Sequence, residues 1–366
     1  MFHPFEIAIG GLSGSGKTTL VEKLIRRFSE NGFEVAALKH GCHRFEIDRE
    51  GKDSDRFRQA GAVPVMIADR EKQAIISQGT GRLDIAGSTL NADLLFIEGL
   101  KELPVPKLLM IDVRREILPP LEAGAIRQAL ALVHDGNGDG LERFRLPLFH
   151  RDDLPAISSF VAEFFSKQAA SVPLNGLVLA GGRSSRMGRD KARLCYHDEK
   201  QLERTAALLS SVCDKVYNSC RSDQLGCYSD SGIPAIADSY LDLGPLGGLL
   251  SAQRHAPGAA WLVAACDLPF IDEPVVSALR AGRNPYRFAT AFAGDEGRPE
   301  PLLAIYEPKS RRRLLERHAA GNDSLCSFLM HSRVRLIEPD EPSKLRNVND
   351  PASMAEARRA IGKGEG

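Results

Sequence analysis

Long apolar runs, paired cysteines and aromatic side chains are all scarce in this sequence. No apolar stretch reaches the roughly 20 residues that a membrane-spanning helix needs, and aromatic residues make up only 6% of the chain. The seven cysteines include no C-x-x-C pair, so neither a disulfide framework nor a zinc knuckle is indicated. The first residues enter an apolar run and a glycine loop without the features of a signal peptide. We therefore expect a cytoplasmic protein with reduced thiols.

An excess of charge of either sign is also missing. The 48 Lys and Arg residues balance the 48 Asp and Glu residues, which argues against non-specific nucleic-acid binding and gives no sign of membrane association. The chain has 366 residues, of which 43% are hydrophobic and 26% charged. This composition is typical of globular proteins, and the length predicts two domains that each bury a core.

The N-terminal part contains a complete phosphate-binding motif. An apolar run at 5–9 is followed by GLSGSGKT, which satisfies G-x-x-x-x-G-K-[ST], and apolar residues then recur at helical spacing over 19–28. Strand, loop and helix form the context in which backbone amides and the lysine bind phosphates and the next hydroxyl binds Mg²⁺. The candidate nucleotide-binding residues, with Thr18 as the Mg²⁺ ligand, are Gly11, Ser13, Gly14, Ser15, Gly16, Lys17, Thr18 and Thr19.

Further apolar runs predict a mostly parallel sheet in this first domain. They lie at 63–68, 74–76, 94–97, 108–113 and 130–133 and alternate with loops and helical stretches. Glu98 follows one of them, where a strand-end carboxylate would meet the Mg²⁺ of the phosphate loop or an attacking water. The alternative is an ordinary glutamate in solvent at a strand end.

The polar stretch at 39–62 is crowded with residues that can bind metals, but their pattern does not predict a permanent metal site. His40, Cys42 and His43 lie close together, but no second pair of ligands follows them, so the sequence does not predict a permanent metal site. Asp48 and Asp53 are better candidates for contacts to a nucleotide-bound Mg²⁺, which uses few protein carboxylates.

The strand and helix alternation restarts in the second half. A helix predicted over 154–168 closes the first domain, and a short linker is expected at 169–173. The predicted domains are therefore 1–168 and 174–366. The second domain opens with LAGGRSSRMGRDK, an apolar run that breaks into Gly181-Gly182 and then Arg183, Arg186 and Lys191. Glycines let backbone amides approach phosphates and the cations neutralise their charge, so this loop is a candidate triphosphate site.

Polar residues also end the other predicted strands of the second domain. If the strands are parallel, Asn218, Asp238 and Asp267 lie at their carboxyl ends, where α/β sheets bind ligands. Asp238 and the GPLGG turn would hold a base or ribose, and Asp267 would hold Mg²⁺, because paired Cys or His ligands for zinc are missing. Phosphoryl-group chemistry can then proceed by positioning and charge neutralisation. Cys266 is disfavoured as a nucleophile because the adjacent carboxylate raises a thiol pKa.

These motifs resemble those of two families. The segment 174–361 resembles the MobA family of molybdenum cofactor guanylyltransferases in LAGGRSSRMGRDK, VYNSCR, GPLGG, CDLP and NVND. The segment 5–133 is similar to the MobB family of GTP-binding partner proteins in its phosphate loop, KH, FEID, GKDS and IEG. The fold that the resemblance implies is α/β with two doubly wound domains, a P-loop NTPase-like domain and a Rossmann-like nucleotidyltransferase domain.

The resemblance implies a reaction and assigns its residues. In the second domain, GMP would be transferred from GTP to the terminal phosphate of molybdopterin with the help of Mg²⁺, and pyrophosphate would be released. The first domain would bind GTP, and whether it also hydrolyses GTP slowly is left open. The implied catalytic residues are Lys191, Asp267 and Arg186. The implied GTP contacts are Leu179, Ala180, Gly181, Gly182, Lys191, Asn218, Asp238 and Asp267. In the second domain Asp267 would bind Mg²⁺, and in the first domain Thr18 and Glu98 are the candidate Mg²⁺ ligands. Asn347 and Asn349 match a motif on the pterin side.

Two departures from the families and two alternatives remain. Gly41-Cys42 replaces a common Asp-His, and GPLGG replaces GPLAG, a difference of one methyl group that we expect to matter little. A cytidylyl or sugar-phosphate nucleotidyltransferase is one alternative, and a GTP-regulated cofactor carrier is the other. The implied partners are GTP, molybdopterin and proteins that mature molybdoenzymes, and a homo-oligomer is left open.

Overall fold

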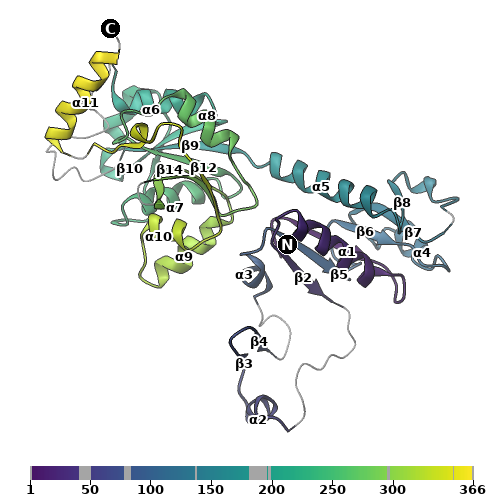
Figure 1. Cartoon of the computed structure of the whole chain (residues 1–366). Coiled ribbons are helices and arrows are strands. Elements are labelled where there is room, and N and C mark those ends of the chain that lie inside the picture. Colours follow the sequence, from purple (N-terminus) through teal and green to yellow (C-terminus); the bar gives the residue numbers. More distant parts are fainter. Residues whose placement is uncertain are drawn as a thin grey trace. The chain divides into compact units, whose positions relative to one another are not determined.

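The chain forms two compact units, Met1–Phe165 and Ser166–Gly366, drawn in Figure 1. The structure is a computed structural model that describes residues 2–40, 51–77, 84–136, 138–180, 196, 199–294, 297–348 and 350–364. No helix within these ranges is long and apolar enough to cross a membrane. Each unit is an α/β fold built on its own sheet, as the alternation of strands and helices predicted.

The first unit is built on a parallel six-stranded sheet of order β2-β5-β1-β6-β7-β8. Its strands are β1 (Glu6–Gly10), β2 (Val35–Lys39), β5 (Leu94–Glu98), β6 (Lys107–Met110), β7 (Ala129–His134) and β8 (Leu148–His150). Its helical segments are α1 (Lys17–Glu30), α3 (Ile85–Thr89), α4 (Leu118–Glu122), η1 (Glu142–Phe144) and α5 (Leu154–Ala170). Because β1 lies inside the sheet, the loop after it opens at the carboxyl edge, between β5 and β6.

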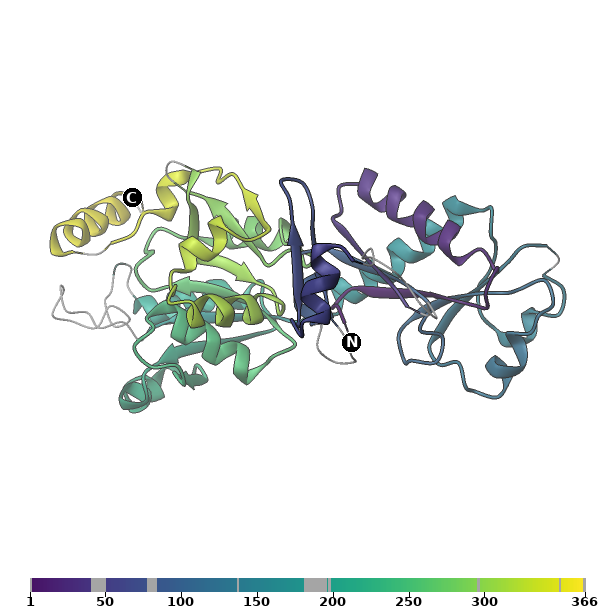
Figure 2. The same cartoon turned by 90° about the horizontal axis from the view of Figure 1, so that it is seen from below.

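Helices cover both faces of this first sheet. Leu20, Leu24 and Phe28 are buried on one side of α1, as their helical spacing predicted. The Phe28 ring lies 5.5 Å from that of Phe96 in β5 and 6.2 Å from that of Phe165 in α5, centroid to centroid. Figure 2 shows α4 on the opposite face from α1 and α5. The first unit is therefore doubly wound.

A small hairpin, separate from the main sheet, interrupts the first unit. Strands β3 (Val65–Ala68) and β4 (Gln73–Ile76) pair antiparallel with each other, after helix α2 (Asp53–Gln59). The apolar runs at 63–68 and 74–76 were predicted as strands of the main sheet, and that prediction was wrong. Most of their apolar side chains lie outside a core, since Met66 is 68% and Ile75 is 47% exposed, whereas Val65 is buried.

One lysine is buried within the first sheet. The side chain of Lys107, in β6, is fully buried, and its Nζ donates to the carbonyl oxygens of Leu103 at 2.8 Å and Arg127 at 2.5 Å. Burial lowers the pKa of Lys107 to about 8, because removing water disfavours the charged ammonium. The two carbonyl acceptors satisfy part of the hydrogen bonding that water would supply.

The two units meet within a helix. Helix α5 continues to Ala170, beyond the boundary between Phe165 and Ser166, and β9 begins at Leu174. Residues 169 and 170 of the expected linker thus belong to the last turn of α5. Only 171–173 connect the helix to the first strand of the second unit.

The second unit has a mixed seven-stranded sheet of order β11-β10-β9-β12-β14-β13-β15. Its strands are β9 (Leu174–Leu179), β10 (Lys215–Cys220), β11 (Ala235–Ala237), β12 (Ala260–Ala265), β13 (Ala289–Ala293), β14 (Pro299–Tyr306) and β15 (Val334–Ile337). The first four strands in this order are parallel to one another. Strand β14 is antiparallel to both of its neighbours, so the assumed parallel arrangement holds for the strands that carry candidate site residues and fails at β14.

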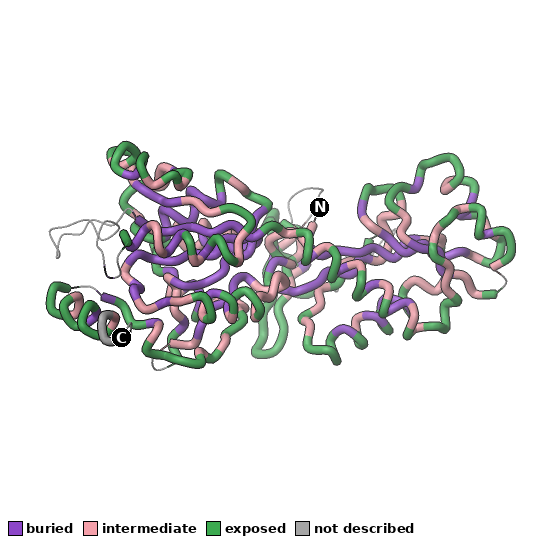
Figure 3. The backbone as a smooth tube through the Cα atoms, turned by 90° about the horizontal axis from the view of Figure 1, so that it is seen from above, coloured by how far each residue is buried: buried purple, intermediate pink, exposed green. Residues whose placement is uncertain are grey.

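Helices again cover both faces of the second sheet. The helical segments are α6 (Gln201–Ser210), η3 (Ser222–Ser231), α7 (Pro245–His255), α8 (Glu273–Ala281), α9 (Ser310–Ala319), α10 (Leu325–Met330), η5 (Pro342–Leu345) and α11 (Pro351–Gly364). Residues of α6 and α8 pack together in one core cluster, while α7 contacts α9. All six residues of β12 are buried, as a strand covered on both faces requires. Figure 3 shows the buried strands inside each unit.

Candidate functional site

The loop after β1 has the geometry of a phosphate-binding loop. Gly14 and Gly16 adopt φ values of 76° and 89°, a region that side-chain-bearing residues avoid, and Gly16 begins α1 as its N-cap. Lys17 Nζ donates to the Leu12 carbonyl oxygen at 2.5 Å, so the lysine folds back over its own loop. The amide groups at this helix N-terminus and the lysine can together bind an anion.

Thr18 and Glu98, both predicted as Mg²⁺ ligands, are brought together. Thr18 Oγ1 donates to Glu98 Oε1 at 3.0 Å, and Lys39 Nζ lies 3.4 Å from the same oxygen. Burial lowers the pKa of Lys17, the nearby Glu98 raises it, and Lys101 and Lys39 lower it further. Sequence reasoning missed Lys101, which follows β5 by only a few residues and adds positive charge beside the loop. A hydroxyl, a carboxylate and several cations suit a nucleotide phosphate with a hard dication.

The remaining predicted residues of this loop differ in exposure, and one more cation is near. Ser13 and Thr19 are exposed and Ser15 is buried. Arg151, just after β8, has its Nη1 3.9 Å from the position that a Cβ on Gly16 would occupy, and 3.4 Å from Asp135 Oδ2. No strand was predicted at β8, so Arg151 was not identified. Asp48 of the expected Mg²⁺ contacts lies outside the described residues, and Asp53 begins α2.

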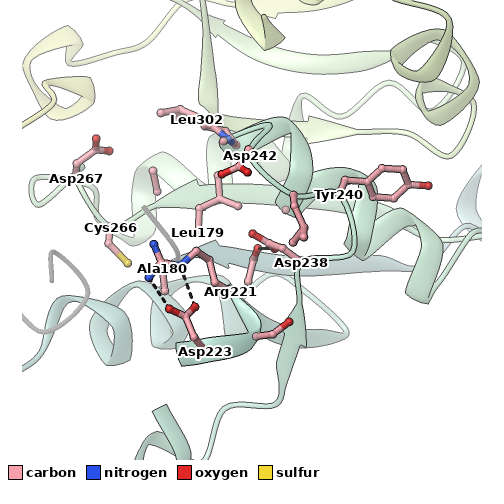
Figure 4. Close-up of a pocket in the computed structure, with 17 residues that line it drawn as sticks. Leu179, Ala180, Arg221, Asp223, Asp238, Tyr240, Asp242, Cys266, Asp267 and Leu302 are labelled. Carbon is pink, nitrogen blue, oxygen red and sulfur yellow. Dashed lines mark hydrogen bonds and ion pairs between the residues drawn. The ribbon is translucent and has the colours of Figure 1, made fainter. Parts of the chain in front are cut away.

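A cavity of about 1120 Å³ opens at the carboxyl edge of the second sheet. Its wall is formed by the ends of β9, β10, β11 and β12, the start of α7, and Leu302 of β14. Figure 4 shows the labelled lining residues converging from these elements. The described lining residues are Leu179, Ala180, Ser219, Arg221, Ser222, Asp223, Asp238, Tyr240, Leu241, Asp242, Gly244, Pro245, Gly248, Ala265, Cys266, Asp267 and Leu302.

Asp238 is fixed in this cavity by a neighbour that sequence reasoning missed. Ser219 Oγ, at the end of β10, donates to Asp238 Oδ1 at 2.7 Å. Burial raises the pKa of Asp238, while the bond from Ser219 and the charge of Arg221 lower it. Ser219 lies directly after the predicted Asn218, and only the pairing of β10 with β11 shows that it reaches Asp238.

Asp267 also lines the cavity, and a predicted motif meets it there. The Val348 amide donates to the Asp267 carbonyl oxygen at 2.8 Å, which brings the NVND stretch to the end of β12. Asn347, predicted on the pterin side, is exposed, and Asn349 lies outside the described residues. Burial raises the pKa of Glu300 in β14, and the charge of Asp267 raises it further. Glu300 is thus a second carboxylate near Asp267 that the sequence did not single out.

Asn218 occupies a different place from the one expected. The predicted strand ended at Asn218, whereas β10 continues to Cys220. Asn218 is fully buried, does not line the cavity among the described residues, and its amide nitrogen and oxygen have no hydrogen-bond partner there. Its predicted contact with GTP stays a prediction.

The loop predicted to hold the triphosphate is described only at its beginning. Leu179 and Ala180 line the cavity. Ala180 is held by its amide, which donates to the Ser219 carbonyl oxygen at 3.0 Å, and by its own carbonyl oxygen, which accepts from Tyr228 Oη at 3.3 Å. The predicted residues Gly181, Gly182, Arg186 and Lys191 lie outside the described residues.

The GPLGG turn is tighter than the sequence suggested. A Cβ on Gly247 would lie 2.3 Å from the Tyr240 carbonyl oxygen, and one on Gly248 would lie 2.5 Å from Ser219 Oγ. The expectation that an alanine at Gly247 matters little was therefore wrong for this chain. Sequence spacing could not reveal the approach of Tyr240, because it depends on how the 240–244 loop folds onto α7.

Fold and sites together define a two-unit protein with a P-loop nucleotide site and a nucleotidyltransferase-like site. Residues 7–135 match the family model "Molybdopterin guanine dinucleotide synthesis protein B" and residues 176–335 match the "MobA-like NTP transferase domain". The chain belongs to these two families, carrying a MobB domain followed by a MobA-like molybdenum cofactor guanylyltransferase domain.

Relatives of each half support this membership. The chain is 33% identical over 183 residues to the "Molybdenum cofactor biosynthesis bifunctional protein" of Synechocystis, a match that covers 50% of this chain and 53% of that protein. It is 30% identical to the "Probable molybdopterin-guanine dinucleotide biosynthesis adapter protein" of Bacillus subtilis, covering 46% of this chain and 99% of the relative. It is 32% identical to the "Molybdenum cofactor guanylyltransferase" of Yersinia pestis, covering 49% and 92%.

Proposed function

We propose that the second unit transfers GMP from GTP to the terminal phosphate of molybdopterin and releases pyrophosphate. The observation that carries this proposal is the cavity at the carboxyl edge of four parallel strands, with Asp238 at β11 and Asp267 at β12. Membership of the guanylyltransferase family supports the choice of substrates. The first unit binds GTP in its P-loop and acts as the adapter domain, with any hydrolysis there slow.

Asp267 fits a role as Mg²⁺ ligand. It lines the cavity, and its donor atoms are carboxylate oxygens of the hard type that Mg²⁺ prefers. No group of three or more His, Cys, Asp and Glu side chains gathers into a metal site within the described part of the chain. A site with few protein ligands suits Mg²⁺, which takes its remaining ligands from phosphates and water. A Mg²⁺ ion bound by Asp267 would neutralise negative charge on the phosphates of GTP.

The chain's own residues orient the two substrates for an in-line displacement. An oxygen of the molybdopterin phosphate bonds to the α-phosphorus of GTP while the bond from that phosphorus to the bridging oxygen of the β-phosphate breaks, and pyrophosphate leaves. Asp238, held by Ser219, binds the nucleoside. Arg186 and Lys191 neutralise charge on the triphosphate and on the pyrophosphate as it leaves. Asn347 precedes Val348, whose backbone amide donates to the carbonyl oxygen of Asp267, which supports Asn347 as a contact of the acceptor, and we assign Asn349 the same role from the motif alone.

In the first unit, Lys17 and the loop amides bind the β- and γ-phosphates of GTP. Thr18 and Glu98, 3.0 Å apart, would hold its Mg²⁺. All of these groups belong to the unit Met1–Phe165, whereas the residues that line the cavity belong to the second unit.

Nucleotide competition tests the proposed transfer. The full chain is incubated with molybdopterin, Mg²⁺ and one α-phosphate-labelled nucleotide, with unlabelled GTP, CTP or UTP as competitor. We expect label to appear in a pterin dinucleotide from GTP, and expect GTP to compete best. A preference for CTP or UTP would reject guanylyl transfer. A Lys17→Ala variant should still transfer GMP, because the first site does not supply the reacting groups, whereas loss of transfer there would favour a carrier.

A further inference from the structure

One wall of the cavity carries an ion pair that the proposed transfer does not use. Arg221 Nε and Nη2 donate to the two carboxylate oxygens of Asp223 at 3.0 and 2.9 Å, and both residues line the cavity. The charge of Arg221 also acts on Asp238 and on Asp242. Among the described lining residues, Arg221 is the sole cation. A guanidinium surrounded by carboxylates therefore faces whatever part of the ligand lies at this wall.

The sheet order determines which part of a nucleotide reaches this wall. In the order β11-β10-β9-β12, Arg221 follows β10 and Asp267 follows β12, two strand spacings or roughly 10 Å away. If the phosphates lie between Asp267 and Ala180 at the end of β9, the nucleoside extends toward β10 and β11. Figure 4 shows Asp267 on the far side of Ala180 from Asp238, and Arg221 facing Asp223 between them. With the phosphates placed between Asp267 and Ala180, the wall that carries the ion pair faces the nucleoside.

We infer that Arg221 and Asp223 read the guanine base, a proposal that rests on GTP being the substrate of this unit. Guanine presents acceptors at O6 and N7 and donors at N1 and the 2-amino group, which match an adjacent guanidinium and carboxylate. Adenine and cytosine place an amino donor where guanine has O6, so the guanidinium would face a donor. The pair with Asp223 uses two of the five N–H groups of Arg221, which leaves donors for the base.

The local fold holds the pair in place before a nucleotide arrives. The Arg221 amide donates to Gln224 Oε1 at 3.3 Å, and the Gln224 amide donates to the Arg221 carbonyl oxygen at 2.9 Å. This reciprocal bonding fixes the start of η3, the segment that carries Asp223. A pre-ordered pair loses less conformational freedom on binding, which favours a role in selectivity.

The test compares nucleotides that differ at the edge in question. ITP is GTP without the 2-amino group, and CTP presents an amino donor. Steady-state kcat/KM for transfer to molybdopterin is measured with GTP, ITP and CTP for the full chain, for Asp223→Asn and for Arg221→Gln. Asp230→Asn is the matched control, because Asp230 lies in the same η3 segment and is exposed outside the cavity lining.

Each substitution has its own expected signature. Asp223→Asn should lower the GTP to ITP ratio of kcat/KM roughly 10-fold, mainly through GTP, because a charged acceptor of the 2-amino group is lost. Arg221→Gln should lower the preference for GTP over CTP roughly 10- to 100-fold. Asp230→Asn should leave both ratios as in the unmodified chain. Active variants at Arg221 and Asp223 with unchanged ratios would overturn the inference while leaving guanylyl transfer intact.

A binding measurement separates failure of this inference from failure of the proposed function. Displacement of a fluorescent GTP analogue by GTP and ITP is followed in a Lys17→Ala background, so that the P-loop site contributes little. If no transfer to molybdopterin occurs but GTP displaces better than ITP and Asp223→Asn removes that difference, the base-reading pair stands and the proposed function fails. Equal displacement by GTP and ITP in the Lys17→Ala chain that retains Arg221 and Asp223 would overturn the inference.

Discussion

Gly247 is a position where one added methyl group would disturb the candidate active site from outside it. A Cβ there would lie 2.3 Å from the Tyr240 carbonyl oxygen, and real Cβ atoms essentially never approach closer than 3.0 Å. The obstacle is backbone, so the 240–244 loop or α7 must shift by about 1 Å, in keeping with the tight packing of protein interiors. Because Tyr240, Gly244 and Pro245 line the cavity, the shift reaches the nucleoside end of the site.

Two opposing terms set the size of the effect of Gly247→Ala. Overpacking destabilises the folded unit by about 1–3 kcal/mol, whereas replacing glycine by alanine within a helix stabilises it by about 1 kcal/mol. We expect the free energy of unfolding of the second unit to fall by about 1 kcal/mol, which corresponds to a decrease in melting temperature of roughly 2–4 °C for a unit of this size. The KM for GTP should rise several-fold, because the walls that hold the nucleoside are displaced.

Trp261 offers a direct assay. It is the single tryptophan of the chain and is fully buried in β12, so its fluorescence reports unfolding of the second unit alone. Gly258→Ala is the matched control, because a Cβ there meets no atom within 4 Å. The reasoning is refuted if Gly247→Ala melts at or above the temperature of the parent chain and keeps its KM for GTP.

Three further changes test other contacts. Thr18→Ala removes the hydroxyl that donates to Glu98 at 3.0 Å and should weaken Mg²⁺-dependent GTP binding by the first unit roughly 10-fold by calorimetry; unchanged binding would contradict the assignment. Ser219→Ala removes a hydrogen bond that lowers the pKa of Asp238, and the pKa of Asp238 should therefore rise. The loss of GTP affinity on acidification should then begin at a higher pH than in the parent chain, which the KM for GTP measured from pH 5 to 8 would show. Burial lowers the pKa of Lys107 to about 8, whereas the lysine of the unfolded chain keeps its proton up to about pH 10.4. Because the unfolded chain binds the extra proton between these values, the free energy of unfolding should rise from pH 8 to 10. Lys107→Met should reduce this rise in urea unfolding followed by circular dichroism.

The parts of the fold that local pattern controls were predictable. The phosphate loop after β1 is determined by a glycine and lysine spacing that a strand-to-helix turn requires, and α1 and β12 follow from helical spacing and from an unbroken apolar run. Glu98 and Asp267 were identified because each follows a buried strand. These signals lie within one element and its end, so they need no knowledge of the neighbours.

The remaining features depend on which elements meet. The bond from Ser219 to Asp238 follows from the pairing of β10 with β11, and the approach of Glu300 to Asp267 follows from the antiparallel placement of β14 beside β12. The two runs that form the β3 and β4 hairpin have ordinary strand composition, and only tertiary packing excludes them from the main sheet. The contact between Gly247 and Tyr240 depends on the same kind of packing.

Transfer from α-labelled GTP to molybdopterin by the Asp267→Asn variant shows directly whether the cavity of the second unit carries out guanylyl transfer. Asp340→Asn serves as the control, because Asp340 is an exposed carboxylate of the same unit outside the cavity lining. We expect the parent chain and the control to form labelled pterin dinucleotide with one pyrophosphate per transfer, and Asp267→Asn to lose roughly 100-fold or more in kcat/KM. Transfer by Asp267→Asn at the rate of the parent chain would contradict this expectation.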